Sequence, residues 1–340
     1  MLIRSKAPLR IGLAGGGTDV SPYSDLFGGA ILNATIDLYA YATLEPLNNG
    51  KIEFCIDGTD RCFVMDSVAE IPLQEEFELF IGVYNRVVRQ FGLGPLSFRL
   101  TSYIEAPQGS GLGTSSTIVV SLLGAFVEWL NLPLGKYDIA HLAYEIERVD
   151  LNMAGGKQDQ YAATFGGINF LEFFSNDKVI VNPLNLKSKI VNELELNLLL
   201  YFTATQRMSA KIISDQVKNV EQKNTQAIEA MHNLKEQAQQ MKDHLIRGEL
   251  SKIGEILRFG WENKKRMANS ISNSTIDEIY EAALKAGATG GKISGAGGGG
   301  FMFFFCPGIT KVNVARSIEK FGGKVQPFKF TAQGLTTWTI

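Results

Sequence analysis

The chain has 340 residues, of which 45% are hydrophobic and 20% are charged, and its net charge is −2. This composition is typical of a globular protein with enough chain for two domains. A charge so close to zero gives no electrostatic basis for binding nucleic acid or an anionic membrane, so neither is expected as a partner. No run reaches 18 apolar residues, and residues 1–20 lack the apolar stretch of a signal peptide. The three cysteines, Cys55, Cys62 and Cys306, are too few for a disulfide framework or a zinc site, which favours a reducing, cytoplasmic location.

A glycine-rich segment follows the first predicted strands. Residues 2–13 are predicted to form one or two short strands, and residues 15–17 are three successive glycines. Glycines at this point would let Arg10 and Asp19 both approach a ligand. A plain turn, with Arg10 on a solvated edge, explains these residues equally well.

The next part of the chain is predicted to add strands and one helix. Residues 28–44 alternate and are rich in Ile, Leu, Tyr and Thr, which indicates a long strand. Shorter strands are expected at 52–54 and 62–65, and helical spacing of apolar residues predicts a helix over 77–91. Alternation over residues 96–103 predicts the strand that leads into the most informative segment.

That segment, residues 105–130, combines a strand end, a glycine-rich loop and an apolar helix. Unpaired N–H groups and the positive end of the helix dipole face such a loop, which is a common way to bind phosphate. Hydroxyl groups at the helix start can also ligate Mg²⁺ that arrives with nucleotide phosphates. The loop lacks the lysine of a Walker A motif, and an N-capped turn without a ligand is the alternative. The predicted phosphate-binding residues are Pro107, Gly109, Ser110, Gly111, Leu112, Gly113, Thr114, Ser115 and Ser116.

Candidate carboxylates follow this helix. Residues 136–150 are predicted to form a second helix, with Glu145 and Glu147 on opposite borders of its buried stripe, so periodicity does not choose between them. Glycines in the next loop, residues 152–161, would let Asp159 enter a crowded site. The alternative role for Asp159 is to cap the helix that runs through Tyr161.

The second half begins with strands and long helices. Strands are predicted at residues 168–174 and 194–205, and the polar stretch between them, residues 183–191, is taken as the domain boundary. Apolar residues from Met208 to Leu245 recur at three- and four-residue steps, which indicates one long helix or two. A dimeric coiled coil is the rival, but no strict heptad is present.

A second run of glycines lies near the C-terminus. Strands predicted at residues 288–294 and 301–306 flank Gly295-Ala296-Gly297-Gly298-Gly299-Gly300. So many glycines favour a close backbone approach to a cleft over a plain hairpin. A helix over 310–320 and a strand over 324–330 complete a split β-α-β arrangement like a ferredoxin-type domain.

Three glycine-rich segments in this order resemble those of the GHMP kinases, the superfamily of galacto-, homoserine, mevalonate and phosphomevalonate kinases. The three segments are residues 8–19, 107–116 and 292–301, and the resemblance spans about residues 4–306. It implies an α+β protein with the two-domain GHMP kinase fold and an active site between the domains. The implied domains are an N-terminal S5-like α/β domain with the phosphate loop, residues 1–185, and a C-terminal ferredoxin-like domain, residues 186–340. The implied cofactors are ATP and Mg²⁺.

The same resemblance assigns roles to single residues. Asp159 takes the position of the catalytic base, and Arg10 takes that of the basic residue facing the transferred phosphoryl group. Glu147 precedes an arginine as the Mg²⁺-binding glutamate of the family does, and Ser115 or Ser116 would complete the metal site. Asp19 would hold sugar hydroxyls. The predicted substrate-binding residues are Gly17, Thr18, Asp19, Arg207, Gly297 and Gly298.

Residues 7–19, 156–161 and 291–301 carry a narrower resemblance. In these strings the chain most resembles the sugar 1-kinases that act on D-glycero-D-manno-heptose 7-phosphate. This implies transfer of the γ-phosphoryl group of ATP to the anomeric hydroxyl, giving the 1,7-bisphosphate used in nucleotide-activated heptose biosynthesis. Arg207, with Lys264 and Lys265 as weaker candidates, would clamp the phosphate that the substrate already carries.

Other functions stay open at this point. They are a galactokinase- or fucokinase-like enzyme and a catalytically silent sugar and nucleotide sensor. A dinucleotide-binding oxidoreductase fails, because no Gly-x-Gly-x-x-Gly follows a strand with an acidic residue about 20 positions on. The oligomeric state is also open and includes a homodimer.

Overall fold

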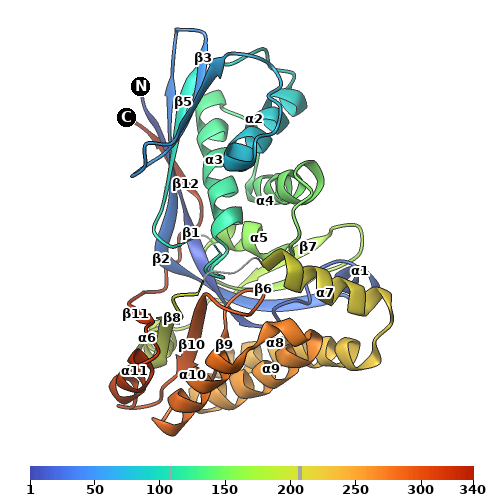
Figure 1. Cartoon of the computed structure of the whole chain (residues 1–340), viewed down its shortest axis with the longest axis vertical. Coiled ribbons are helices and arrows are strands. Elements are labelled where there is room, and N and C mark those ends of the chain that lie inside the picture. Colours follow the sequence, from blue (N-terminus) through green and yellow to red (C-terminus); the bar gives the residue numbers. More distant parts are fainter. Residues whose placement is uncertain (108, 206–208) are drawn as a thin grey trace.

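The computed structural model describes residues 1–107, 109–205 and 209–340, and these residues form two β-sheets with helices packed on them (Figure 1). This mixed α and β architecture is the one that the sequence predicts. No helix in these three ranges is both long enough and apolar enough to span a membrane.

The larger sheet is built around two long antiparallel strands, β1 (Ile3–Ala14) and β2 (Gly29–Pro46). The strand order is β12-β1-β2-β5-β3-β4, and a second branch, β6-β7, pairs with the first part of β2. Because β2 has 18 residues, it reaches both branches. The remaining strands are β3 (Lys51–Ile56), β4 (Cys62–Asp66), β5 (Phe98–Ile104), β6 (Ile168–Phe173), β7 (Val179–Pro183) and β12 (Thr336–Thr339).

Helices α2 to α5 lie on one side of this sheet (Figure 1). The central helix α3 is almost entirely apolar after its first turn, so it can be buried on nearly all sides, and it contacts β1, β2, α2, α4 and α5. Its position matters because its N-terminus carries the glycine-rich loop. The elements are α1 (Tyr23–Phe27), the 3₁₀ turn η1 (Glu75–Phe77), α2 (Glu78–Phe91), α3 (Thr114–Leu130), α4 (Lys136–Glu145), the π-helical turn η2 (Ile146–Asp150) and α5 (Gln158–Phe165).

The smaller sheet is antiparallel with the order β11-β8-β10-β9. This order is that of a ferredoxin-like sheet, as predicted, with several helices inserted after the first strand. The strands are β8 (Leu198–Phe202), β9 (Gly290–Ile293), β10 (Phe301–Phe305) and β11 (Lys324–Gln326). The helices are α6 (Ser188–Asn197), α7 (Ser209–Glu221), α8 (Thr225–Arg247), α9 (Ile253–Met267), α10 (Ser274–Lys285) and α11 (Lys311–Glu319), with 3₁₀ turns η3 (Leu250–Lys252) and η4 (Asn269–Ile271).

One apolar core is shared by the two sheets. It joins Leu9 and Ile11 of β1 to Leu200 of β8, Phe303 of β10 and Met241 of α8. The last strand, β12, also returns to pair with β1, so the two termini lie side by side (Figure 1). A boundary at residue 185 stays a prediction.

Several predicted elements differ in detail. Residues 194–197 end helix α6 rather than begin a strand, and the long helical region is split into α7 and α8. Cys55 and Cys62 are joined by a disulfide, although the small number of cysteines predicted no disulfide framework. They are direct partners across the antiparallel pair β3 and β4, and this places their side chains together whatever the cysteine count.

Candidate functional site

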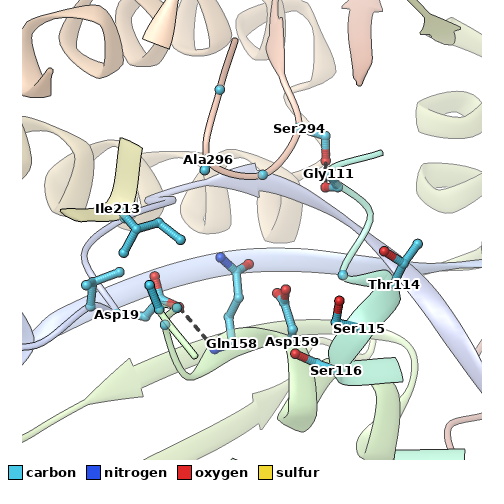
Figure 2. A pocket seen from close by; sticks show the side chains of 18 of the residues that line it. Asp19, Gly111, Thr114, Ser115, Ser116, Gln158, Asp159, Ile213, Ser294 and Ala296 are labelled. Carbon is cyan, nitrogen blue, oxygen red and sulfur yellow. Dashed lines mark hydrogen bonds between the residues drawn. The ribbon is translucent and has the colours of Figure 1, made fainter. Parts of the chain in front are cut away.

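The three glycine-rich segments meet in one pocket between the two sheets. Its walls include Gly17 of the first segment, Gly111 and Gly113 of the second, and Gly295 and Gly297 of the third. Figure 2 shows the loop at Gly111 facing the loop that carries Ser294 and Ala296, with Asp159 below them.

The second segment forms the strand, glycine-rich loop and helix that its sequence predicts. Gly113 has φ +80° and precedes Thr114, the first residue of α3. A Cβ at Gly113 would lie 3.2 Å from the Asp159 carboxylate, so glycine lets the helix N-terminus approach that carboxylate. Among the predicted phosphate-binding residues, those lining the pocket are Gly109, Gly111, Gly113, Thr114, Ser115 and Ser116.

Three other residues predicted in this loop do not line the pocket. The Pro107 ring is exposed and does not line the pocket. The Leu112 side chain lies in the shared core, and its carbonyl accepts a hydrogen bond from the Arg10 amide. The Ser110 carbonyl accepts one from the Phe301 amide of β10. Leu112 and Ser110 hold the loop in place, because they tie it to β1 and to the smaller sheet.

The two predicted catalytic residues form one ion pair. Arg10 on β1 donates from Nε and Nη2 to the two carboxylate oxygens of Asp159, each at 2.7 Å, and from Nη1 to the Gly111 carbonyl at 2.6 Å. Arg10 is 3% exposed, whereas the Asp159 side chain keeps 21% of its surface open to the pocket. Asp159 therefore does not cap helix α5. It is paired with a cation and faces the phosphate loop.

Asp19 is the group that caps this helix. Its Oδ2 accepts hydrogen bonds from the backbone amides of Lys157 (2.9 Å) and Gln158 (3.1 Å). Burial and the nearby Asp159 carboxylate raise the pKa of Asp19, and the backbone amides of Gln158 and of Asp19 itself, together with Arg10, oppose that shift. A Cβ at Gly156 would overlap Oδ2, so glycine is needed there for this approach.

Two of the predicted metal ligands, Ser116 and Glu147, are bridged by one buried glutamine. Gln160 Nε2 donates to Ser116 Oγ at 3.1 Å and also to the Glu147 carboxylate. Glu147 is 1% exposed, and burial raises its pKa, opposed by Arg148 and by the hydrogen bonds from Ser116 and Gln160. These hard oxygen donors suit Mg²⁺, which takes few protein ligands and completes its shell with water and phosphate oxygens.

Two buried lysines adjoin the first glycine segment. Lys264 of α9 lines the pocket and donates to the Gly16 carbonyl at 3.3 Å, and Lys292 of β9 donates to the Gly12 carbonyl at 3.0 Å. Burial lowers the pKa of Lys264 to about 8 despite the attraction of Asp19, and Arg10 lowers it further. Burial also lowers the pKa of Lys292, helped by repulsion from Lys264 and Arg10. The site therefore concentrates positive charge beside two carboxylates.

Comparison with known proteins agrees with this geometry. Residues 78–167 match the model of the GHMP kinases N terminal domain, and residues 241–324 match that of the GHMP kinases C terminal domain. The chain is 47% identical over 338 residues to D-glycero-alpha-D-manno-heptose 7-phosphate kinase of Campylobacter jejuni, with 99% of each chain covered. This chain belongs to the GHMP kinases.

Two more relatives place it within the family. A crystal structure titled as a D-glycero-D-manno-heptose 1-phosphate kinase of Bacteroides thetaiotaomicron shares 48% identity and 99% of each chain, with a TM-score of 0.85. The bifunctional fucokinase/GDP-fucose pyrophosphorylase of Arabidopsis thaliana is 25% identical over 91% of this chain but 30% of its own. GHMP kinases are ATP-dependent phosphotransferases that generally use Mg²⁺, and this chain is such a phosphotransferase.

Only some of the predicted substrate-binding residues of this GHMP kinase line the pocket. Gly17, Asp19 and Gly297 line it. Gly298 does not, and its amide bonds to the Ile271 carbonyl instead. Thr18 does not either: its hydroxyl donates to the carbonyls of Gly15 and Ala30, which fixes the turn after β1. Arg207 lies outside the described residues.

Some groups at the site were missed or undervalued by the sequence analysis. Gln160 and Lys292 lie inside the strings 156–161 and 291–301 that carry the resemblance, but no role was assigned to either side chain. Lys264 and Lys265 were equal candidates, and the structure separates them. Lys265 pairs with Glu262 and lies over the Trp261 ring, whereas Lys264 enters the pocket.

Proposed function

We propose that this GHMP kinase transfers the γ-phosphoryl group of ATP to the anomeric hydroxyl of D-glycero-D-manno-heptose 7-phosphate, giving the 1,7-bisphosphate. The observation that carries the proposal is the 47% identity, over 99% of both chains, to an enzyme named for that substrate. The product would then feed the synthesis of nucleotide-activated heptose, and the reaction would take place in the cytoplasm. A homodimer is the oligomeric state that we would test first.

The residues of the pocket have roles that suit this reaction. Asp159 would orient the acceptor hydroxyl and take its proton, since the Arg10 guanidinium stabilises its carboxylate. Arg10 would also stabilise charge on the phosphoryl oxygens, while the amides at the start of α3 bind the ATP phosphates. Mg²⁺, held by Glu147 and by Ser115 or Ser116, would neutralise phosphate charge when bound.

Substrate recognition would involve the opposite side of the pocket. The second Asp19 oxygen, Oδ1, would accept a hydrogen bond from a sugar hydroxyl, because the amides of Lys157 and Gln158 both bind Oδ2. We propose that Gly17 and Gly297 form the adjacent walls and that Arg207 is one of the residues that hold the substrate phosphate. Replacement of Arg207 with Ala should raise KM for a phosphorylated sugar far more than for its unphosphorylated analogue. An equal change in both would exclude that role.

The test should include heptose 1-phosphate as a second acceptor, because the Bacteroides relative is named a heptose 1-phosphate kinase. ADP release would be measured with Mg-ATP and a panel of heptose 7-phosphate, heptose 1-phosphate, mannose, galactose, fucose and mevalonate. Turnover confined to heptose 7-phosphate supports the proposal, and turnover on another panel member replaces it. ATP binding without turnover on any acceptor would refute the proposal and favour a catalytically silent sugar and nucleotide sensor. The Asp159→Asn variant is the control for enzyme-catalysed release.

A further inference from the structure

The pocket contains a buried carboxamide whose nitrogen has no partner. Gln216 of helix α7 is 3% exposed, and its Nε2 makes no hydrogen bond within the described part of the chain. The side chain lines the pocket, one helical turn from Ile213, which lines it too. Leaving a buried donor without a partner costs about 1–3 kcal/mol, so a ligand that accepts a hydrogen bond from Gln216 would remove this cost.

A buried ammonium group, that of Lys264, lies on the same side of the pocket as Gln216. Lys264 is 2% exposed, lines the pocket, and uses one of its three N–H donors on the Gly16 carbonyl. No carboxylate forms an ion pair with it among the described residues. Both side chains adjoin the first glycine segment: an ideal Cβ at Gly16 would lie 3.7 Å from Lys264 Nζ, and one at Gly17 would lie 3.5 Å from Gln216 Oε1.

The charges around Lys264 favour an anion. Arg10 and Lys292 repel its ammonium group, and Asp19 attracts it. Asp19 is held by two backbone amides, and the other nearby carboxylate, Asp159, is neutralised by Arg10. Lys264 is therefore a cation with unused donors, in a region where positive charge is not fully balanced.

The side of the pocket that carries Gln216 and Lys264 lies away from the phosphate loop. In Figure 2, Gln158 and Asp159 lie between Asp19 and Ile213 on one side and Thr114 and Ser115 on the other. A substrate whose hydroxyl reaches Asp159 would direct its far end toward Asp19 and α7.

From these contacts we infer that Gln216 and Lys264 form the subsite for the phosphate monoester that the sugar substrate carries. The inference rests on the proposed function, because it requires a phosphorylated acceptor. The same chemistry is present in the γ-phosphate of ATP, and the test below separates the two sources. Both side chains would bind the substrate phosphate directly, at a distance from the bond that forms.

The kinetic test compares Lys264→Met and Gln216→Leu with wild type, using heptose 7-phosphate, unphosphorylated heptose and ATP as the varied substrates. Loss of a hydrogen bond to a charged group predicts a roughly 10- to 100-fold rise in KM for heptose 7-phosphate with Lys264→Met. Gln216→Leu should raise it about tenfold. KM for unphosphorylated heptose and for ATP should change less than about threefold. Lys218→Met is the matched control, since it removes an exposed charge from the same helix α7.

The outcomes separate the alternatives. Equal rises for both sugars would overturn the subsite, because the residues would then act only through general pocket structure. A rise confined to ATP would overturn it as well and would assign Lys264 to the transferred phosphoryl group. Unchanged KM for heptose 7-phosphate, with wild-type turnover intact, would overturn the subsite and leave the proposed function standing.

A binding measurement covers the case in which the heptose assignment fails. Inorganic phosphate is titrated by calorimetry into enzyme saturated with a non-hydrolysable ATP analogue and Mg²⁺, so that the phosphate loop is filled. Wild type and Lys218→Met should bind phosphate, and Lys264→Met and Gln216→Leu should lose binding at least tenfold. Such a loss supports the anion subsite even if the sugar is a different one. Equal phosphate binding by all four proteins, or none by wild type, overturns it.

Discussion

The ion pair between Arg10 and Asp159 should couple stability to catalysis, and replacing Arg10 with Met tests this. Arg10 makes three hydrogen bonds, two to Asp159 and one to the Gly111 carbonyl. A hydrogen bond to a charged group contributes about 1.5–3 kcal/mol. Water can replace part of this, because the Asp159 side chain is 21% exposed, so we expect a loss of about 3 kcal/mol in the free energy of unfolding rather than the full sum. Loss of a charge-stabilising donor should also lower kcat roughly 100- to 1,000-fold.

A double-mutant cycle isolates the pair. Arg10→Met, Asp159→Asn and the double variant are unfolded in urea, and the free energies of unfolding are compared with that of wild type. Residues in direct contact predict a coupling of about 1–3 kcal/mol, whereas independent sites add to within about 0.5 kcal/mol. Arg10→Lys is the matched variant, since it keeps the charge but loses the forked geometry, and it should keep part of the coupling. Additive effects in the cycle would refute the pair as an energetic unit, and near wild-type kcat in Asp159→Asn would refute its role as a base.

Three further predictions concern the residues around this pair. The lowered pKa of Lys264 means that the unfolded chain binds more protons between about pH 8 and pH 10.5, so wild-type stability should rise with pH across that window. Lys264→Met should show a smaller rise, because Lys292 still contributes to it, and should be more stable than wild type at pH 7 by about 1–2 kcal/mol. An equal change of the unfolding free energy with pH in the two proteins would contradict this. Gly156→Ala should lower the free energy of unfolding by about 1–3 kcal/mol and raise KM for the sugar, because the new Cβ must displace Asp19. Gly94→Ala is the control: it has open space around it and should leave thermal unfolding unchanged. Gln160→Leu should raise the Mg²⁺ concentration for half-maximal activity about tenfold, since Gln160 orients Ser116 and Glu147, and an unchanged Mg²⁺ titration would show that this orientation is unimportant.

The choice between Glu145 and Glu147 shows where sequence periodicity stops being informative. Helix α4 ends at Glu145, and residues 146–150 form a π-helical turn. A π turn changes the helical phase, so a stripe drawn at 3.6 residues per turn cannot tell which carboxylate faces inward. Glu147 becomes buried beside Ser116, whereas Glu145 pairs with Arg86 away from the pocket. Only the family resemblance pointed to Glu147.

The predicted strands, the central helix and the glycine loops follow from local patterns, and most of them lie where expected. The partners of Asp159 do not follow from such patterns. Arg10 is 149 positions away in the sequence, and its approach depends on the register of β1 against β2 and on the packing of α5 on both. The same holds for Lys264, which differs from Lys265 only by the side of α9 that contacts the rest of the protein.

The glycine-rich segment at residues 295–300 has a physical explanation in the contact between the two sheets. A Cβ at Gly300 would overlap the Ser110 carbonyl, and one at Gly111 would overlap the Ser294 carbonyl. Glycine at both positions lets the two loops pack backbone against backbone, and the Phe301 amide then bonds to the Ser110 carbonyl at 2.8 Å. The phosphate loop is therefore completed only when the smaller sheet is docked, because one of its carbonyl groups and its Gly111 contact depend on that sheet. The entropy cost of so many glycines is thus linked to nucleotide binding, and both halves of the chain are needed to form the site where ATP would bind.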